Sequence, residues 1–298
     1  MTKLVFGCGY LGERVARRWL DAGHDVVVVT RSLERAEQFM QQGSGAIVAD
    51  VTQPETLVGL PAADTVLFAV GYDRSAGRSI ADVYAGGVRN VLSALPSDSG
   101  RFIYISTTGV YGDAGGDWVD EDTPSDPQRD GGRASLAAEQ ALAKSPFASR
   151  GIVLRLAGIY GPGRVPFLDK LRAGEPIPAV REGHLNLIHV DDAAAVVVAA
   201  GVAGRTQLNR KRMVYCVSDG HPVRRGEYYR TVARLIGAPS PAFVKPDLNS
   251  PRAVRAEADR RVKNARMLAE LSVRLAFPDY RAGLAAILGG CESADGAV

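Results

Sequence analysis

The sequence has few cysteines and no long apolar run. Three cysteines in 298 residues, Cys8, Cys216 and Cys291, are too few and too scattered for a disulfide framework or a metal site. No apolar run reaches the roughly 18 residues that a membrane-spanning helix needs, and the chain enters its first expected strand without a signal-peptide pattern. We therefore expect a cytoplasmic protein without a metal and without membrane association.

Lysine is also scarce, with six residues against thirty arginines. The net charge is only +3, and no cluster of basic residues is long enough to form a nucleic-acid-binding stripe. We therefore expect no nucleic-acid partner. None of the ten tyrosines is followed four residues later by a lysine, an absence that matters for the chemistry below. The hydrophobic content of 46% is sufficient for a substantial core.

The stretch of residues 3–31 has a strand-helix-strand pattern around a glycine fingerprint. The apolar run Leu4 to Phe6 stops at Gly7, and Gly9 and Gly12 complete G-x-G-x-x-G as an amphipathic helix begins. In such a unit the first glycine allows a tight turn, the second lets the backbone approach a pyrophosphate, and the third lets helix and strand pack closely. The helix N-terminus then faces the phosphates. This pattern predicts dinucleotide binding, with a purely structural glycine turn as the alternative.

The end of the second expected strand indicates which dinucleotide binds. A NAD site would place Asp or Glu about 20 residues after the glycines, but this chain has Thr30, Arg31 and Ser32 there. A guanidinium and two hydroxyls suit a ribose 2′-phosphate. The sequence therefore predicts NADP in preference to NAD. The alternative is that Arg31 is an ordinary solvated arginine in an Arg-rich chain.

Strand-like and helix-like segments alternate as far as residue 156. Apolar segments follow at 46–49, 65–70, 102–105 and 152–156. The alternation predicts an α/β fold with a Rossmann-type, doubly wound parallel sheet that binds ligands beyond the carboxyl ends of its strands. We expect an NAD(P)-binding domain over residues 1–160 and a smaller C-terminal, substrate-facing lobe over 161–298, with segments that return to the sheet.

The strand ends supply the remaining candidate cofactor contacts. Asp50 ends the third expected strand, where the adenine end would lie, although capping of the next helix is an equal alternative. Gly71 follows the fourth strand, where the chain would cross the middle of the cofactor. The predicted cofactor-binding residues are Gly7, Gly9, Tyr10, Leu11, Gly12, Arg31, Ser32, Asp50, Val51, Ala69, Val70, Gly71 and Leu156.

A run of hydroxyl side chains, S-T-T-G-V-Y-G over 106–112, comes directly after the fifth expected strand. Hydroxyls there can hydrogen-bond a substrate carbonyl or hydroxyl near the nicotinamide, whereas strand-end capping is the alternative. Residues 113–132 are acidic, contain several prolines and glycines, and lack apolar periodicity. We expect this segment to form a long loop over the site. A helix is expected to follow it over residues 133–144.

Several segments, in order, resemble the extended short-chain dehydrogenase/reductases, the NAD(P)-dependent nucleotide-sugar epimerase/dehydratase family. They are the glycine fingerprint, S-T-T-G-V-Y-G, Glu139-Gln140, R-L-A-G-I-Y-G-P-G over 155–163, I-H-V-D-D over 188–192 and Y-C-V-S-D-G over 215–220. The resemblance covers nearly the whole chain. It implies that Thr107 matches the catalytic Ser/Thr, that the substrate is a small, nucleotide-sugar-like molecule, and that a homodimer is a candidate assembly. The fingerprint departs from the family's commoner G-x-x-G-x-x-G and looks more like its atypical members.

The main departure from that family is its catalytic pair. The family places Tyr and Lys four residues apart and Glu four further on; the tyrosinate transfers the proton and the lysine lowers its pKa. Counting back from Glu139 gives Ser135 for the lysine and Gly131 for the tyrosine. The usual Tyr-Lys chemistry is therefore not expected, although the fold and cofactor binding are unaffected.

Four residues are candidates to replace that pair. Tyr111 at the edge of the fifth strand and Tyr160 after the sixth are possible proton carriers, and Arg133 is a positive charge near the lysine position. His189 is a further candidate, with a packed, hydrogen-bonded core histidine as the alternative. Tyr111 has its own alternative as an aromatic side chain packed on the cofactor or core. We take Thr107 and Tyr111 as the predicted catalytic residues.

Two functions from different classes follow. The first is an NAD(P)-dependent oxidoreductase or epimerase/dehydratase-like enzyme that acts on a hydroxyl or carbonyl carbon of a sugar-like substrate. The second is a non-catalytic NADP-binding module that reports the redox state of the cofactor to a partner. The hydroxyl run favours the enzyme, and the absent Tyr-Lys pair favours the module.

Overall fold

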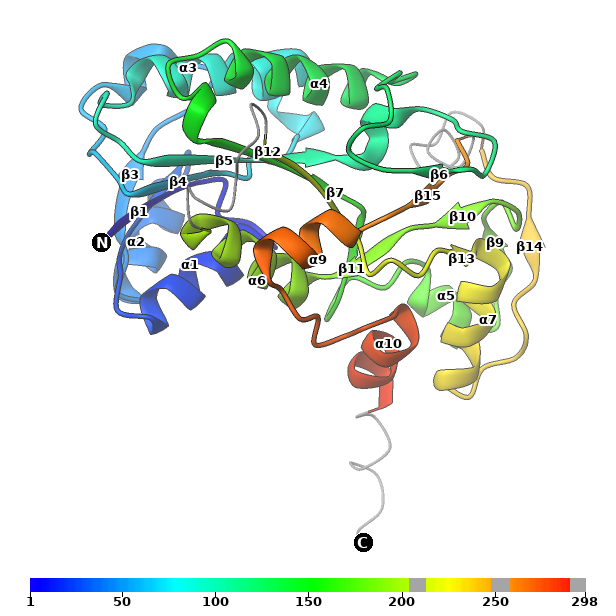
Figure 1. Cartoon of the computed structure of the whole chain (residues 1–298). Helices are drawn as coiled ribbons and strands as arrows, with labels where there is room; N and C mark the ends of the chain where they lie inside the picture. Colours follow the sequence, from blue (N-terminus) through cyan, green and yellow to red (C-terminus); the bar gives the residue numbers. More distant parts are fainter. Residues whose placement is uncertain (204–212, 248–257, 290–298) are drawn as a thin grey trace, which may run out of the picture.

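A computed structural model describes residues 1–203, 213–247 and 258–289 of the chain. Its centre is a seven-stranded sheet in the order β12-β7-β5-β4-β1-β2-β3, in which every neighbouring pair is parallel (Figure 1). The strands are β1 Thr2–Phe6, β2 Asp25–Thr30, β3 Gly45–Val48, β4 Thr65–Phe68, β5 Arg101–Thr107, β7 Gly151–Leu156 and β12 Met213–Val217. The strand order reverses between β1 and β4, as in a doubly wound sheet. The predicted Rossmann-type fold is confirmed.

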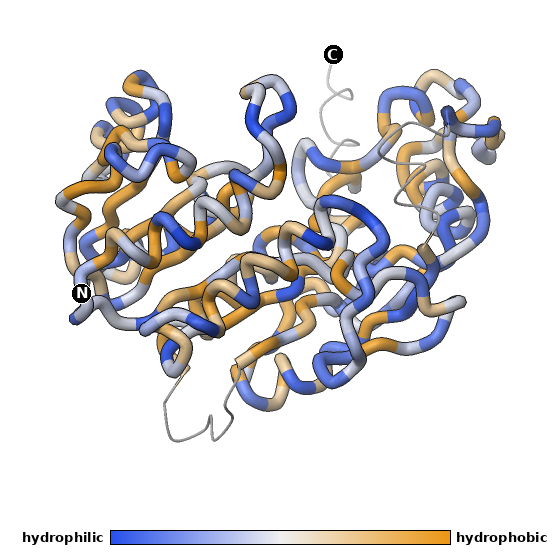
Figure 2. The backbone as a smooth tube through the Cα atoms, turned by 90° about the horizontal axis from the view of Figure 1, so that it is seen from above, coloured by the Kyte–Doolittle hydropathy of each residue, from blue (hydrophilic) through white to orange (hydrophobic). Residues whose placement is uncertain are grey.

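Helices cover both faces of this sheet. Helices α1 Gly12–Asp21, α2 Leu33–Gln41, α6 Val190–Val202 and α9 Ala265–Leu271 pack on one face, and α3 Gly87–Ala94 and α4 Asp130–Ala143 on the other. A π-helical turn, η3 Asp82–Gly86, precedes α3. Strands β4 and β7 are buried along their whole length and are mostly apolar, as expected for parallel strands covered on both sides (Figure 2). The 3-10 turns are η1 Pro54–Leu57, η2 Arg74–Ala76, η4 Thr108–Tyr111 and η5 Ala148–Arg150.

The C-terminal part contributes a second, smaller layer beside the carboxyl ends of the strands. It has its own apolar cluster, centred on Tyr160, Tyr228 and Tyr280. Its helices are α5 Leu168–Arg172, α7 Arg225–Leu235 and α10 Tyr280–Leu288. Its short strand pairs are β8 Gly158–Tyr160 with β11 Leu187–His189, β9 Ile177–Pro178 with β14 Phe243–Val244, β10 His184–Leu185 with β13 Val223–Arg224, and β6 Trp118–Val119 with β15 Arg261–Val262.

Later segments return to the sheet, as predicted. Strand β12 forms the sheet edge next to β7, and α6 packs under the sheet against α1. Two local predictions differ. Helix α4 begins at Asp130 rather than Arg133, and within the segment 113–129 the strand β6 pairs with β15. The first part of this segment is therefore held against the C-terminal part, while its end, residues 128–132, lines the cavity at the carboxyl ends of the strands.

Candidate cofactor and substrate site

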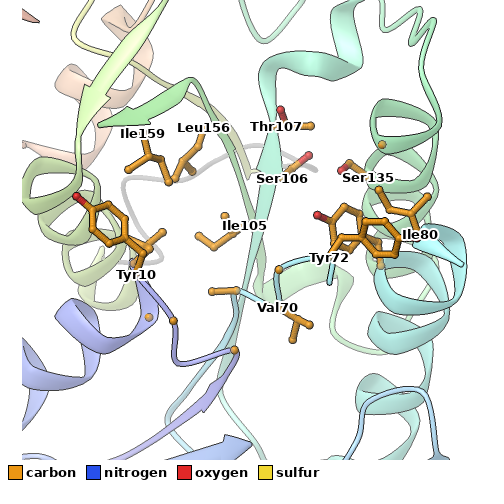
Figure 3. A pocket seen from close by; sticks show the side chains of 18 of the residues that line it. Tyr10, Val70, Tyr72, Ile80, Ile105, Ser106, Thr107, Ser135, Leu156 and Ile159 are labelled. Carbon is orange, nitrogen blue, oxygen red and sulfur yellow. The ribbon is translucent and has the colours of Figure 1, made fainter. Parts of the chain in front are cut away.

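A cavity of about 1430 Å³ opens at the carboxyl ends of β1, β2, β4, β5 and β7. Figure 3 shows Thr107 and Ser106 at the end of β5 beside Ser135 on α4, with Tyr10 and Ile159 on the opposite wall. Pockets for drug-sized ligands measure roughly 300–1,000 Å³. The cavity therefore has room for a dinucleotide together with a second molecule.

The three fingerprint glycines differ in what a side chain at each position would meet. Gly7 has a φ of +85°, and a Cβ there would lie 2.5 Å from the backbone of Ala69, so only glycine fits this turn. A Cβ on Gly12 would lie 2.3 Å from the Gly7 carbonyl oxygen. Gly9 differs from both, because a Cβ there would meet no atom within 4 Å. The backbone at Gly9 is therefore open to the cavity, where a pyrophosphate could approach it.

Most of the predicted site residues line the cavity together. They come from the ends of six strands, β1, β2, β3, β4, β5 and β7, which are adjacent in the sheet. They are Gly7, Gly9, Tyr10, Leu11, Gly12, Arg31, Val51, Ala69, Val70, Gly71, Thr107 and Leu156.

Ser32 and Asp50 are not among the lining residues, since both side chains bind the local backbone. The Ser32 hydroxyl caps α2 by accepting a hydrogen bond from the Arg35 amide at 3.2 Å. Asp50 Oδ1 accepts bonds of 2.8 Å from the amide and the hydroxyl of Thr52. The Asp50 side chain thus closes a turn after β3 and does not cap the next helical turn, η1, whose N-cap residue is Gln53.

The structure does not bring Tyr111 to the cavity. The 3-10 turn after β5 directs its ring into a buried cluster, where the hydroxyl accepts a 2.9 Å hydrogen bond from Arg155 and lies 3.0 Å from the Cys216 sulfur. Burial raises the pKa of Tyr111 above its usual range, so the phenol stays protonated at neutral pH. Tyr111 therefore occupies a structural position.

The positions expected for the family's Tyr-Lys pair face the cavity. Gly131 and Ser135 lie on the first turns of α4 and line it. One turn later, Glu139 is buried and accepts hydrogen bonds from Ser106 at 2.6 Å and from Arg155 at 2.7 Å. These bonds fix α4 against β5 and β7, and they engage the Ser106 hydroxyl away from any ligand.

Two other proton-carrier candidates are also buried. His189 caps α6, accepting a 3.2 Å hydrogen bond from the Asp191 amide, and its ring packs between Tyr160 and Phe277. Burial lowers the pKa of His189 and raises that of Tyr160. Neither residue lines the cavity. The alternative of a packed, hydrogen-bonded histidine is confirmed.

The cavity is strongly cationic. Among its lining residues in the part of the chain that the structure describes, only one is acidic, Asp130, and six are arginines: Arg31, Arg35, Arg74, Arg129, Arg133 and Arg164. Such a surface favours anionic ligands. Three of these arginines lie near the end of β2 and the loop after β4, and the other three lie around α4 and the loop after β8.

Sequence reasoning missed several lining residues. They reach the cavity from loops and helix turns whose course depends on the tertiary fold: Tyr72, Ile80, Tyr84, Arg35, Arg74, Gln128, Arg129 and Arg164. The only signal for Arg129 was its place just before the α4 pattern.

Within the residues described, no three His, Cys, Asp or Glu side chains gather as metal ligands, and no helix is long and apolar enough to cross a bilayer.

The fold and the glycine turn define a Rossmann-type, NAD(P)-binding protein. The family model of the NAD dependent epimerase/dehydratase family matches residues 4–214. The chain therefore belongs to this family.

Known proteins resemble the chain over most of its length. It is 28% identical to Protein YeeZ of Escherichia coli over 92% of this chain and 96% of that protein. It is 25% identical to the 2-alkyl-3-oxoalkanoate reductase of Stenotrophomonas maltophilia, over 78% and 74% of the two chains. A structure described as a NAD-dependent epimerase/dehydratase from Methylobacillus flagellatus matches with 32% identity and a TM-score of 0.77, over 97% and 98% of the chains.

Proposed function

We propose that this protein is an NADP-dependent oxidoreductase that acts on a hydroxyl or carbonyl carbon of a small, sugar-like substrate. The observation that carries the proposal is the single cavity in which the glycine turn at Gly9 and the hydroxyl of Thr107 both take part. A cofactor bound at one end would bring its reacting ring towards the other end of the same cavity. The substrate would then occupy the part of the cavity that the dinucleotide leaves free.

The residues present fit such a cofactor. The open backbone at Gly9 receives the pyrophosphate, while Arg31, Arg35 and Arg74 surround the position of the ribose 2′-phosphate. When bound, the cofactor supplies or accepts a hydride. Arg31 lies 3.4 Å from Asp73 in an exposed ion pair. A bound 2′-phosphate would replace Asp73 as the partner of Arg31.

Thr107 is the proton-handling group in this proposal. Its Oγ1 accepts a 3.0 Å hydrogen bond from the Gly109 amide, and a hydroxyl that accepts one hydrogen bond can still donate its own hydrogen to a substrate oxygen in the cavity. A catalytic group must come within about 2.6–3.2 Å of the proton's other site. Tyr10, Tyr72 and Tyr84 also line the cavity, and burial raises the pKa values of Tyr10 and Tyr84.

The second candidate function is the non-catalytic NADP-binding module. It is favoured by Gly131 and Ser135, which stand at the positions where the family carries its acid-base pair. The similarity to a relative named as a reductase supports the enzyme instead.

A panel of carbonyl and sugar substrates separates the two functions. Oxidation of NADPH by the wild-type protein is expected with at least one carbonyl compound. Thr107→Ala should lower kcat by roughly 10² to 10⁴ while the affinity for NADPH stays constant. If NADPH binds but no carbonyl oxidises it, the module becomes the better description. If Thr107→Ala retains full turnover, Thr107 does not handle the proton.

A further inference from the structure

One side chain of the glycine turn contacts the C-terminal layer. The Tyr10 hydroxyl donates a 3.0 Å hydrogen bond to the carbonyl oxygen of Pro162, in the loop 161–164 that follows β8. A Cβ atom on Gly161 would lie 2.5 Å from the Tyr10 hydroxyl oxygen, so a glycine there lets the two segments approach each other. The glycine turn and the C-terminal layer are therefore joined at the wall of the cavity.

Two arginines pack against the Tyr10 ring. The guanidinium carbon of Arg14 lies 4.4 Å from the ring centroid, and that of Arg164 lies 5.1 Å from it. Arg14 already has partners, since it forms a 3.1 Å ion pair with Asp191 and donates a 2.8 Å hydrogen bond to the Tyr10 carbonyl oxygen. Arg164 lines the cavity and Arg14 does not. Of the two, Arg164 is therefore the one that can offer its charge to a ligand.

The charge of Arg164 is not used within the described part of the chain. Its side chain is exposed, and its guanidinium has neither an ion pair nor a hydrogen bond with the residues that the structure describes. Its main chain is fixed, because its amide donates a 2.9 Å hydrogen bond to the Gly161 carbonyl oxygen. A planar guanidinium that stacks on an aromatic face keeps its N–H donors free for a phosphate. The Tyr10 ring therefore holds Arg164 without occupying these donors.

The backbone beside Tyr10 indicates which anion Arg164 meets. Gly9 leaves the turn open to the cavity, and α1 begins at Gly12, so the positive end of its dipole faces the same place. That dipole is equivalent to about half an elementary charge, whereas a pyrophosphate carries a negative charge on each phosphate. Gly9, Tyr10 and Arg164 line one cavity. A guanidinium from the C-terminal layer would supply the charge that the helix end leaves unbalanced.

We propose that Arg164 binds the pyrophosphate of the dinucleotide, and that Tyr10 is a positioning residue that holds Arg164 beside the glycine turn. Figure 3 shows the Tyr10 ring at this turn, on the wall opposite Ser135. The C-terminal layer thereby takes part in cofactor binding as well as in substrate binding. The inference rests on the dinucleotide binding of the proposed function, but not on turnover or on a preference for NADP, because NAD and NADP share the pyrophosphate.

Arg172 provides a matched control. It lies on α5 in the same layer, is exposed, and forms a 3.6 Å ion pair with Asp169. It is not among the residues that line the cavity. Arg164→Gln and Arg172→Gln remove the same charge from neighbouring parts of the chain, but only the first removes a donor from the cavity.

The first test uses ADP-ribose, which contains the pyrophosphate but neither nicotinamide nor a 2′-phosphate. In calorimetric titrations the wild-type protein should bind ADP-ribose, and Arg164→Gln should weaken binding by about 10-fold, as expected for a lost charge-assisted hydrogen bond. Arg172→Gln should stay within about twofold of wild type. No binding by the wild type, or equal affinities of the two variants, would overturn the proposal. A change in Arg164→Gln that is confined to the KM of a carbonyl substrate would assign Arg164 to the substrate instead.

The two cofactors distinguish the pyrophosphate from the 2′-phosphate. Arg164→Gln should weaken NADPH and NADH binding by the same factor and leave the ratio of the two affinities unchanged, whereas Arg31→Asp should change this ratio. A loss for NADPH alone would place Arg164 at the 2′-phosphate and contradict the proposal. A protein that binds NADPH through Arg164 but oxidises it with no carbonyl would reject the oxidoreductase and keep this contact.

A double-mutant cycle tests the positioning role of Tyr10. Tyr10→Leu removes the aromatic face, so the affinity of otherwise wild-type protein for ADP-ribose should fall by about three- to fivefold. In the Arg164→Gln protein the same change should cost less than about twofold, because the ring then has no guanidinium to hold. Tyr10→Phe keeps the ring and should retain most of the affinity. A merely structural role of Tyr10 predicts equal losses in both backgrounds, and that result would contradict the positioning role.

Discussion

The two ends of the cavity are built in different ways. At the end near β1 the backbone forms the binding surface, and Gly7, Gly9 and Gly12 keep the turn free of side chains. At the end near β5 and α4 side chains form the surface, and Gly131 and Ser135 occupy the positions of the family's acid-base pair. The first end keeps a glycine turn, although not the family's commoner G-x-x-G-x-x-G, and the second lacks tyrosine and lysine at the positions expected for the pair.

This difference shows that cofactor binding and chemistry rest on separate elements. The glycine turn joins β1 to α1, whereas the positions of the acid-base pair belong to α4, on the opposite face of the sheet. Replacement of the pair therefore leaves the turn intact. Glu139 still binds Ser106 and Arg155 and so keeps α4 in place without the Tyr-Lys pair.

The largest effect is expected at the backbone-lined end. Gly9→Val should abolish dinucleotide binding, because the side chain would fill the space that the pyrophosphate needs. The fold should survive, since a Cβ at Gly9 meets no atom within 4 Å. Calorimetric titration with NADPH and a thermal unfolding curve check the two statements. A folded variant that binds NADPH normally would show that the glycine fingerprint is only a structural turn and not a pyrophosphate-binding site.

A smaller effect at the same end concerns cofactor choice. Wild type should bind NADPH more tightly than NADH, and Arg31→Asp should reverse this preference. A charge-assisted contact with the 2′-phosphate corresponds to about 10- to 100-fold in affinity. Titrations of both proteins with both cofactors measure the change. Equal affinities of the wild type for NADPH and NADH would show that Arg31 does not determine the choice between the two cofactors.

A buried carboxyl group in the C-terminal part contrasts with the exposed cations of the cavity. Asp219 is 3% exposed, and burial raises its pKa from 3.8 to about 7. Between about pH 4 and pH 7 the folded protein holds a proton that the unfolded chain has released, so stability falls as the pH rises through this window. Above pH 7 this contribution no longer changes with pH.

Asp219→Asn should flatten that dependence. The wild-type free energy of unfolding should drop by roughly 2–3 kcal/mol more than that of the variant between pH 5 and pH 8. Urea unfolding at the two pH values measures this difference. Parallel pH profiles for the two proteins would show that Asp219 ionises normally in the fold.

The smallest effect is expected at Tyr111. Loss of its hydroxyl removes one partner of the buried Arg155, so Tyr111→Phe should lower the free energy of unfolding by about 1–3 kcal/mol. The kcat value and NADPH affinity should stay near wild type, because Tyr111 does not line the cavity. A large loss of kcat at an unchanged free energy of unfolding would instead indicate that Tyr111 transfers the proton.

The parts of the site that the sequence predicted depend on short-range patterns. The glycine fingerprint, the strand ends and Thr107 lie next to apolar runs, and parallel strands bring their carboxyl ends to one edge of the sheet. The parallel, doubly wound character of the sheet followed from the same alternation of strands and helices. These features needed no knowledge of how distant loops fold.

The rest of the site depends on long-range packing. Tyr111 sits only four residues after Thr107, yet one 3-10 turn directs it into the cluster with Arg155 and Cys216. Arg129 was missed because α4 begins three residues earlier than its apolar pattern indicates. Neither a single turn nor a helix start within a polar segment has a strong local signature.

A crystal structure of the wild-type protein soaked with NADPH tests the account most directly. We expect the pyrophosphate against Gly9, the 2′-phosphate beside Arg31, and the nicotinamide C4 facing Thr107 at the end of β5. Tyr111 should remain in its buried cluster, away from the ring. A nicotinamide ring turned away from β5, or a NADPH molecule bound outside the glycine turn, would contradict the account.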